Sequence, residues 1–330
     1  MSSHTIGLQK MKIARALFFL ALASILPVTP AQTAGWPDKP VRVVVPFAPG
    51  GGTDIVARII SARLTDTFGQ QFVVDNRGGA GGLIGMEIVA HANPDGYTLA
   101  VVSASYSANP ALYKLSYDPV NGISPVSLMA AGPLIMVVHP SVPAHNLNEF
   151  IALAHAKPGT LNFGSSGTGG SIHLAIELFR QLTKTDMQHV PYKGTGPAMT
   201  DLLAGHIQFL FAPGTVSLPQ VKAGKVRALA VTTPQRSRAL PDLPAIEEVV
   251  PGFEYVSWHG MLAPAGTPKE TIMRLNKALD EILKRPDVQE RLRADGVEPA
   301  HTTPEDFARR LAREIATWKK VVKVGKIKAE

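Results

Sequence analysis

Apolar and polar positions follow two kinds of pattern along the first third of the chain. The run 41–47 is rich in β-branched residues and predicts a buried strand. A glycine-rich segment, 48–54, follows it, and the apolar positions of 55–68 then repeat with the period of a helix. The same order recurs, with strands predicted at 72–75 and 97–102, a glycine-rich loop at 76–82 and a helix at 83–90. Strands separated by helices favour a parallel sheet, whose ligands bind beyond the carboxyl ends of the strands.

A second region with the same pattern begins after the apolar segment 133–138. Its glycine-serine segment, 164–171, lies between a predicted strand and a predicted helix, as 48–54 does in the first region. The other elements predicted are helices at 147–156, 172–182, 269–283 and 304–324 and strands at 161–163, 206–211, 226–232 and 257–262. No glycine- or serine-rich linker separates the two regions, so we expect two lobes joined by crossing strands.

The predicted fold is therefore α/β, with two sheets flanked by helices and a cleft between two lobes. The length of 330 residues agrees with this, because a single hydrophobic core rarely serves more than about 250–300 residues. We expect domain 1 to be discontinuous, with residues 35–130 and 259–330, and domain 2 to comprise residues 131–258.

The first 34 residues have the pattern of an export signal that is removed from the mature protein. A basic stretch that ends at Arg15 precedes an apolar run, 16–26, and small residues follow it. This run is too short to span a bilayer, which takes about 20 residues. We therefore expect a soluble mature protein outside the cytoplasm, in a bacterium in the periplasm, that begins near Ala34. Met11 is an alternative start of the chain.

Charge and cysteine content exclude several functional classes. Without three cations of the export signal, Lys10, Lys12 and Arg15, the chain has 30 basic against 26 acidic residues, and its net charge falls from +7 to +4. The remaining cations are scattered, except in a tail expected to be a solvated helix, with Lys319, Lys320, Lys323, Lys326 and Lys328. This distribution argues against nucleic-acid binding. The absence of cysteine excludes disulfides and thiolate chemistry, and the histidines lack metal-site spacing, so we predict no metal and no cofactor.

The two long glycine loops have the composition of an anion site without cations. Each leads into a predicted helix, whose first N–H groups have no acceptor and bear a partial positive charge. The loops contain hydroxyls but neither lysine nor arginine; the hydroxyls are those of Thr53, Ser165, Ser166, Thr168 and Ser171. The lysine of a nucleotide-hydrolysing loop is replaced by Gly170, and the dinucleotide fingerprint is absent.

A hydrolytic site is a weaker interpretation of the same serines. Ser165 or Ser166 could act as a nucleophile with His173 or His189 as its base. The nucleophile motif GxSxG is absent, however, and serines at a helix start are more often caps. Of the other histidines, only His259, which follows Trp258, has a plausible position in the cleft.

Eight ordered motifs resemble the tripartite tricarboxylate transporter substrate-binding family, whose members are also called Bug or TctC receptors. They are WPDKPVR at 36–42, VPFAPGGGTD at 45–54, NR at 76–77 before GAGG at 79–82, PDGYTL at 94–99, NPALY at 109–113, GSSG at 164–167, HVPYKG at 189–194 and APAGTP at 263–268. They extend over essentially the whole mature chain. One departure is Gly78, where the family usually has proline.

The resemblance implies a two-lobed periplasmic binding protein of type II topology, with a small carboxylate held between the lobes. The positions that match the family's ligand loops are Phe47, Ala48, Gly51, Thr53 and Asp54 in the first lobe and Ser165, Ser166, Thr168 and Gly169 in the second. Candidates for the variable part of the pocket are Ser103, Ser105, Tyr192 and Trp258. Asp54 is unexpected beside an anion. It either accepts hydrogen bonds from the amides of its own loop, which we favour, or meets a positive group on the ligand.

Three functions follow from these observations. The leading one is a monomeric, non-enzymatic receptor that delivers an organic acid, amino acid or aromatic acid to the integral-membrane subunits of a tripartite tricarboxylate-type permease. The alternative is a periplasmic sensor that uses the same pocket to signal to a two-component system. The third, a secreted hydrolase, requires a catalytic triad in the cleft.

Overall fold

The computed structural model describes residues 35–325, apart from 238–239 and 295. The predicted export signal, together with Lys326 and Lys328 of the basic tail, therefore lies outside the described residues. Among the residues that are described, no helix has both the length and the apolar character needed to cross a bilayer. From Pro37 onward the chain forms a single compact unit, and two sheets run through it.

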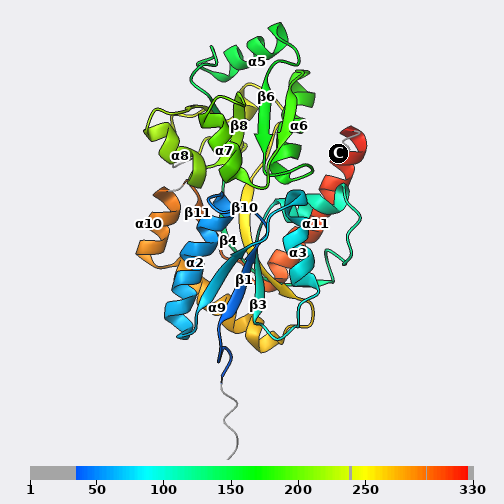
Figure 1. The fold of residues 1–330 in the computed structure, drawn as a ribbon, viewed down its shortest axis with the longest axis vertical. Coiled ribbons are helices and arrows are strands. Elements are labelled where there is room, and N and C mark those ends of the chain that lie inside the picture. The colour runs from blue at the N-terminus through cyan, green and yellow to red at the C-terminus, as the bar shows by residue number, and fades with distance from the viewer. Residues whose placement is uncertain (1–34, 238–239, 295, 326–330) are drawn as a thin grey trace, which may run out of the picture. The chain divides into compact units, whose positions relative to one another are not determined.

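The larger sheet has six strands in the order β11-β4-β10-β3-β1-β2 and lies in the lower half of Figure 1. β1 pairs in parallel with β2 and β3, whereas β10 runs antiparallel to both β3 and β4. The strands are β1 (Val41–Val45), β2 (Phe72–Asn76), β3 (Thr98–Ser103), β4 (Ile123–Gly132), β10 (Ser257–Pro264) and β11 (Glu298–Pro299).

The smaller sheet has five strands in the order β7-β6-β8-β5-β9. β6 pairs in parallel with β7 and β8, and β5 runs antiparallel to β8 and β9. The strands are β5 (Leu134–Val138), β6 (Asn162–Ser165), β7 (Gln188–Pro191), β8 (Phe209–Pro213) and β9 (Arg227–Val231). The predicted α/β class, with two sheets flanked by helices, is confirmed.

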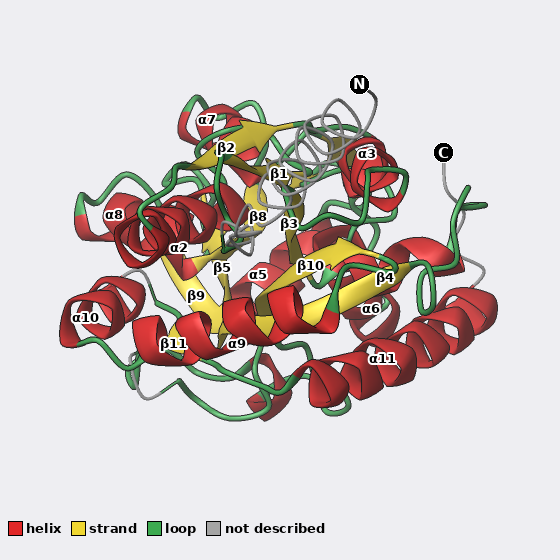
Figure 2. Ribbon diagram, turned by 90° about the horizontal axis from the view of Figure 1, so that it is seen from below, coloured by secondary structure: helices red, strands yellow, loops and turns green. Residues whose placement is uncertain are grey.

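Ten α-helices are described in the residues from 35 to 325, and α9 and α11 pack on β4 (Figure 2). They are α2 (Gly52–Phe68), α3 (Leu83–Ala90), α4 (Ser105–Ala108), α5 (Leu147–Ala156), α6 (Ser171–Thr183), α7 (Thr195–Leu203), α8 (Gly214–Lys222), α9 (Lys269–Leu283), α10 (Pro286–Ala294) and α11 (Pro304–Gly325). Among the elements that were not predicted from the sequence are α7, α8 and β4. Each contains a proline, at 197, 219 and 125, and proline normally argues against the interior of a helix or strand.

The expected parallel arrangement holds only for β2-β1-β3 and β7-β6-β8. β5 and β10 run the other way because each follows a change of sheet. The chain passes from β4 to β5 at Pro133 and returns from β9 to β10. The predicted domain boundaries, after residues 130 and 258, fall inside β4 and β10, and they stay a prediction.

Buried side chains hold the crossing strand β10 in place. All eight of its residues are buried, and the ring of Trp258 packs edge-on against Phe307 of α11, with centroids 5.4 Å apart. Gly260, two residues along, lies directly under the same Phe307 ring, so that a β-carbon there would overlap it. The start of β10 is thereby fixed between the two sheets.

We expect Gly260→Ala to destabilise the fold by about 1–3 kcal/mol, because the added methyl group must displace Phe307. Urea unfolding followed by circular dichroism measures the change. A second substitution, Phe307→Leu, should recover part of the lost free energy of unfolding, because the smaller side chain makes room for the added methyl group. An unchanged unfolding midpoint for Gly260→Ala alone would contradict this packing.

Candidate functional site

A small cavity, called the cleft cavity below, lies where the carboxyl ends of β1 and β3 meet the loops that precede α6 and α7. Its volume is about 20 Å³, which is room for about one water molecule. The lining residues are Phe47, Gly51, Thr53, Ser103, Ser166, Ser171, Ile172, Thr195, Pro213, Ser257 and His259. Five of the thirteen predicted site residues are among them: Phe47, Gly51, Thr53, Ser103 and Ser166.

Three helices that begin at this cavity have a glycine as N-cap and so no side-chain cap from that residue. The N-cap residues of α2, α6 and α7 are Gly51, Gly170 and Gly194, and none of them provides a capping hydrogen bond from a side chain. α5, by contrast, begins at Asn146, whose side chain accepts the amide of Glu149 at 2.9 Å. The uncapped starts present N–H groups and the positive ends of three helix dipoles. No lysine or arginine is among the described residues that line the cavity, so the site favours an anion through backbone groups and hydroxyls.

Asp54 is turned into its own loop. Its carboxylate accepts hydrogen bonds of 3.0 Å from the amide of Gly50, the guanidinium of Arg58 and the amide side chain of Asn76. Burial by itself raises the pKa of this carboxyl, but the three donors outweigh burial and hold the pKa below its ordinary value. Asn76 also donates to the carbonyl of Phe47 at 3.0 Å, so that the acid fixes the shape of the loop. This is the first of the two roles expected for Asp54.

Contacts between the two sheets' loops close the cleft cavity. The amide of Ala48 donates to the carbonyl of Lys193 at 2.9 Å. On the other side, the hydroxyl of Ser105 accepts the amide of Ser171 at 3.0 Å and lies 3.0 Å from its hydroxyl. Ala48 and Ser105 therefore join the loops rather than line the cavity. A ligand larger than water enters only when these loops move apart.

Ser165, Thr168 and Gly169 belong to the framework of the serine-glycine loop. The hydroxyl of Ser165 lies 2.7 Å from Nε2 of His189 and accepts the amide of Gly167 at 3.1 Å. The amide of Gly169 donates to Nδ1 of His173 at 3.1 Å, and the two imidazoles stack with centroids 3.9 Å apart. Burial lowers the pKa of His189 to about 3, so this ring is neutral near pH 7. The carbonyl of Thr168 accepts the hydroxyl of Tyr113.

The Ser165–His189 contact has the length of a catalytic dyad but lacks its other features. Ser165 is fully buried and does not line the cleft cavity. Nδ1 of His189 has no hydrogen-bond partner among the described residues, so no carboxylate there orients the imidazole. The arrangement supports a structural role for the pair.

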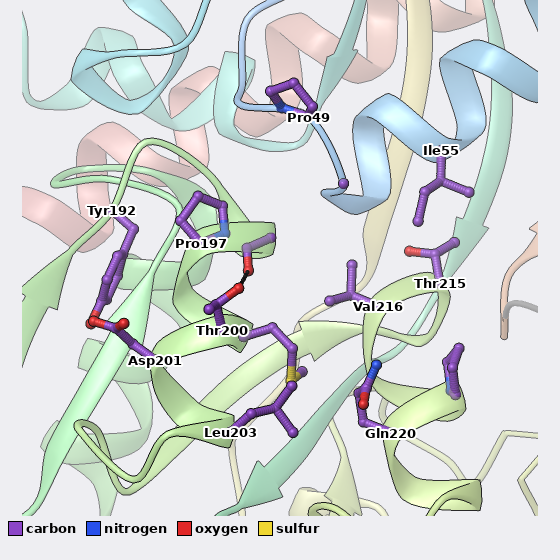
Figure 3. A pocket seen from close by; sticks show the side chains of 14 residues that line it. Pro49, Ile55, Tyr192, Pro197, Thr200, Asp201, Leu203, Thr215, Val216 and Gln220 are labelled. Carbon is purple, nitrogen blue, oxygen red and sulfur yellow. Dashed lines mark hydrogen bonds between the residues drawn. The ribbon is translucent and has the colours of Figure 1, made fainter.

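Tyr192 faces a second, open groove of about 710 Å³ beside the cleft cavity (Figure 3). Its hydroxyl donates to Asp201 at 2.7 Å, and α7, α8 and the loop at Pro49 form the walls of the groove. The hydrogen bond to Asp201 and burial together raise the pKa of Tyr192, with burial the larger cause. Tyr192 is thus separated from the cleft cavity.

Trp258 lies on the face of β10 that is opposite the cleft cavity. Its indole N–H donates to Glu314 of α11 at 2.9 Å, and the ring is fully buried. Since successive side chains of a strand point to opposite faces, its neighbours Ser257 and His259 line the cavity instead. The sequence predicts a strand at 257–262 but does not indicate which of its faces meets the cleft.

Six lining residues were not among the thirteen predicted site residues: Ser171, Ile172, Thr195, Pro213, Ser257 and His259. The sequence does indicate two of them, Ser171 as a hydroxyl of the glycine loops and His259 as the histidine with a plausible position in the cleft. Thr195 and Pro213 come from α7 and the end of β8, where helix starts were not recognised. The glycine before Thr195 was the available signal, because an uncapped glycine also precedes α2 and α6.

Comparison with known proteins identifies similar sequences and structures. A sequence profile for tripartite tricarboxylate transporter family receptors matches residues 56–326. The BugT protein of Bordetella pertussis is 36% identical over 92% of this chain and 94% of its own length.

Two similar solved structures come from Rhodopseudomonas palustris. Rpa4515 with adipate is 38% identical, with a TM-score of 0.86 over 89% of this chain and 99% of that one. MatC with bound malate is 35% identical, with a TM-score of 0.83 over 87% of this chain and 100% of its own.

We expect Asp54→Asn to lower the free energy of unfolding by about 1–3 kcal/mol at pH 7, because the loop loses a charged acceptor. The folded-state pKa of Asp54 lies below its unfolded value of 3.8, so this stabilisation is complete above pH 3.8 and is lost as the pH falls through the folded-state pKa. Urea unfolding of both proteins between pH 7 and pH 2.5 should show the difference shrinking in acid. A difference that is constant with pH would contradict the ionised role.

Proposed function

Because the chain belongs to the tripartite tricarboxylate transporter family of receptors, we propose that it captures a small carboxylate outside the cytoplasm and delivers it to a membrane permease. The family predicted from the sequence motifs is confirmed by these matches. Delivery to a permease is inferred from the family's name. The similar proteins Rpa4515 and MatC, with adipate and malate, support a carboxylate as the ligand.

One observation above all supports the proposed ligand class. Three glycine-capped helix starts meet at a cavity whose lining has hydroxyls but no lysine or arginine among the described residues. A carboxylate has several lone pairs to satisfy, and backbone N–H and hydroxyl donors satisfy them at short range. We propose that the binding residues include Phe47, Gly51, Thr53, Ser103, Ser166, Ser171, Thr195 and Ser257.

The remaining predicted site residues have supporting roles in this proposal. Ala48, Asp54, Ser105, Ser165, Thr168 and Gly169 hold the two loops, through the hydrogen bonds described above. Tyr192 and Trp258 contact other parts of the structure and are left out of the proposed pocket.

The location and the absence of turnover are part of the same proposal. The pattern of residues 1–34 is that of an export signal, which supports the periplasm of a bacterium. Ser165 and His189 lack an orienting acid and are sealed from the cleft cavity, which supports binding without chemistry. Nuclear magnetic resonance of the ligand after prolonged incubation should therefore find it unchanged.

A preferred carboxylate should raise the melting temperature of the protein by several degrees. At one hundred times the dissociation constant, binding stabilises the folded state by about 2.7 kcal/mol. Differential scanning fluorimetry against mono-, di- and tricarboxylates, amino acids and aromatic acids measures the shift. If no acid in this panel changes the melting temperature, the proposal that the protein binds a small carboxylate is contradicted.

Ser166→Ala should weaken binding of that carboxylate by about 0.5–3 kcal/mol, which is roughly 2- to 150-fold, since it removes a hydroxyl that lines the cavity. Lys193→Ala serves as the control, because this exposed cation adjoins the site without lining it, and it should change affinity little. Isothermal titration calorimetry compares the two. The reverse order of effects would mean that a side-chain cation holds the anion.

A further inference from the structure

His259 is a buried polar side chain in the cleft cavity whose Nδ1 has no hydrogen-bond partner among the described residues. It is 2% exposed and lines the cavity, and its Nδ1 has no hydrogen bond to any described residue. It pairs across the sheet with Ser103, and Ser257 precedes it on the same face of β10. A buried polar group without a partner is costly, and in native structures it usually has a functional reason.

No charged group compensates for the burial of this imidazole. Burial alone lowers the pKa of His259 to about 4, so the ring is neutral near pH 7. Glu314 and Arg310 of α11 lie on the other face of β10, against Trp258. Asp54 is turned into its loop, and no charged side chain is among the described residues that line the cavity with it.

We propose that His259 binds the second polar group of a ligand held at the glycine-capped helix starts, and that it takes up one proton from solvent when this group is a carboxylate. The proposal rests on the proposed function as a carboxylate receptor. In this proposal, different kinds of protein group bind the two ends of the ligand. Backbone N–H groups and hydroxyls bind one end, and a side chain that can titrate binds the other.

Electrostatics in a closed cavity give the direction of this coupling. A carboxylate brought within hydrogen-bond distance of the ring attracts a proton to it and raises the pKa of His259 from its low value. A ligand with an apolar end instead leaves the imidazole buried and unpaired, as it is without ligand. The site should therefore favour dicarboxylates over monocarboxylates, because only a dicarboxylate gives the imidazole a hydrogen bond that it lacks in the free protein.

The test compares straight-chain acids of matched length: succinate, glutarate and adipate against butyrate, pentanoate and hexanoate. Calorimetric titrations at pH 6 in buffers with different ionisation enthalpies report the protons taken up on binding. The variants are His259→Gln, which keeps a hydrogen-bonding side chain but cannot titrate, and His259→Phe, which keeps a ring. The control is His206→Gln, which removes an exposed histidine far from the cavity lining.

We expect the unaltered protein and the His206→Gln variant to prefer a dicarboxylate by at least tenfold and to take up a measurable fraction of a proton with it. The His259→Gln variant should bind the same acid without that uptake. Its affinity relative to the unaltered protein should fall as the pH is lowered from 7 to 5, because only the imidazole gains from added protons. Because the same acid is compared across the variants, its own protonation contributes equally to each affinity and cancels in the ratio of affinities.

Three results would overturn the inference while leaving the proposed function intact. They are equal affinity for matched mono- and dicarboxylates, a preference for monocarboxylates, or proton uptake that persists in His259→Gln. If none of these acids nor any in the wider panel binds, the proposed function itself fails.

A direct measurement follows His259 in the unaltered protein and uses a variant only to assign its signal. Nuclear magnetic resonance of histidine labelled with ¹³C and ¹⁵N follows the titration of His259, assigned by its disappearance in His259→Gln. Its pKa should lie well below the ordinary value without ligand and should rise when the dicarboxylate is added. An unmoved titration in the presence of a saturating dicarboxylate would overturn the proposal.

Discussion

Backbone N–H groups at three helix starts with glycine N-caps are the feature on which the rest of this site depends. A helix start needs an acceptor, and most helices take one from a serine, threonine, aspartate or asparagine side chain. α2, α6 and α7 begin at glycines, which provide none. At α6 the hydroxyl of Ser105 accepts the amide of Ser171, and in the proposed function an anionic ligand provides further acceptors at these helix starts. Because the donors belong to the backbone, they are fixed in place by the same helices and sheets that form the fold, and little conformational entropy is lost when they bind.

Such backbone donors require that the two sets of loops approach closely, and glycine makes this possible. A β-carbon at Gly78 would lie 2.9 Å from the amide of Ala48 and 3.0 Å from the carbonyl of Lys193, which share the hydrogen bond across the cleft. A β-carbon at Gly167, at a φ of +132°, would lie 2.9 Å from the amide of Gly81. The absence of side chains at these positions therefore governs how tightly the cavity closes.

Neutral and paired polar groups hold the loops without placing a net charge in the cavity. The stacked His173 and His189 support the serine-glycine loop through hydrogen bonds to Gly169 and Ser165, and burial keeps the ring of His189 neutral near pH 7. Asp54 is charged, but Arg58 neutralises it and both are turned away from the ligand side. An anion in the cavity therefore meets dipoles rather than competing charges. His259 differs from these groups, since it faces the cavity and its Nδ1 has no partner among the residues that the structure describes.

The sequence by itself determined the class of fold, the family and the positions of the glycine-rich loops. Patterns such as 41–47 and 147–156 depend on local periodicity, and glycine-rich segments such as 48–54 mark their loops directly, so no distant contact was needed to recognise them. Only the tertiary structure decided which side chains face the cavity. Trp258 and His259 are neighbours with opposite surroundings, because a strand alternates its faces and the packing of Trp258 against Phe307 and Glu314 selects one of them. Ser165 and Ser166 likewise differ, one buried in the loop framework and the other lining the cavity, because contacts with His189, 24 residues away, orient the first.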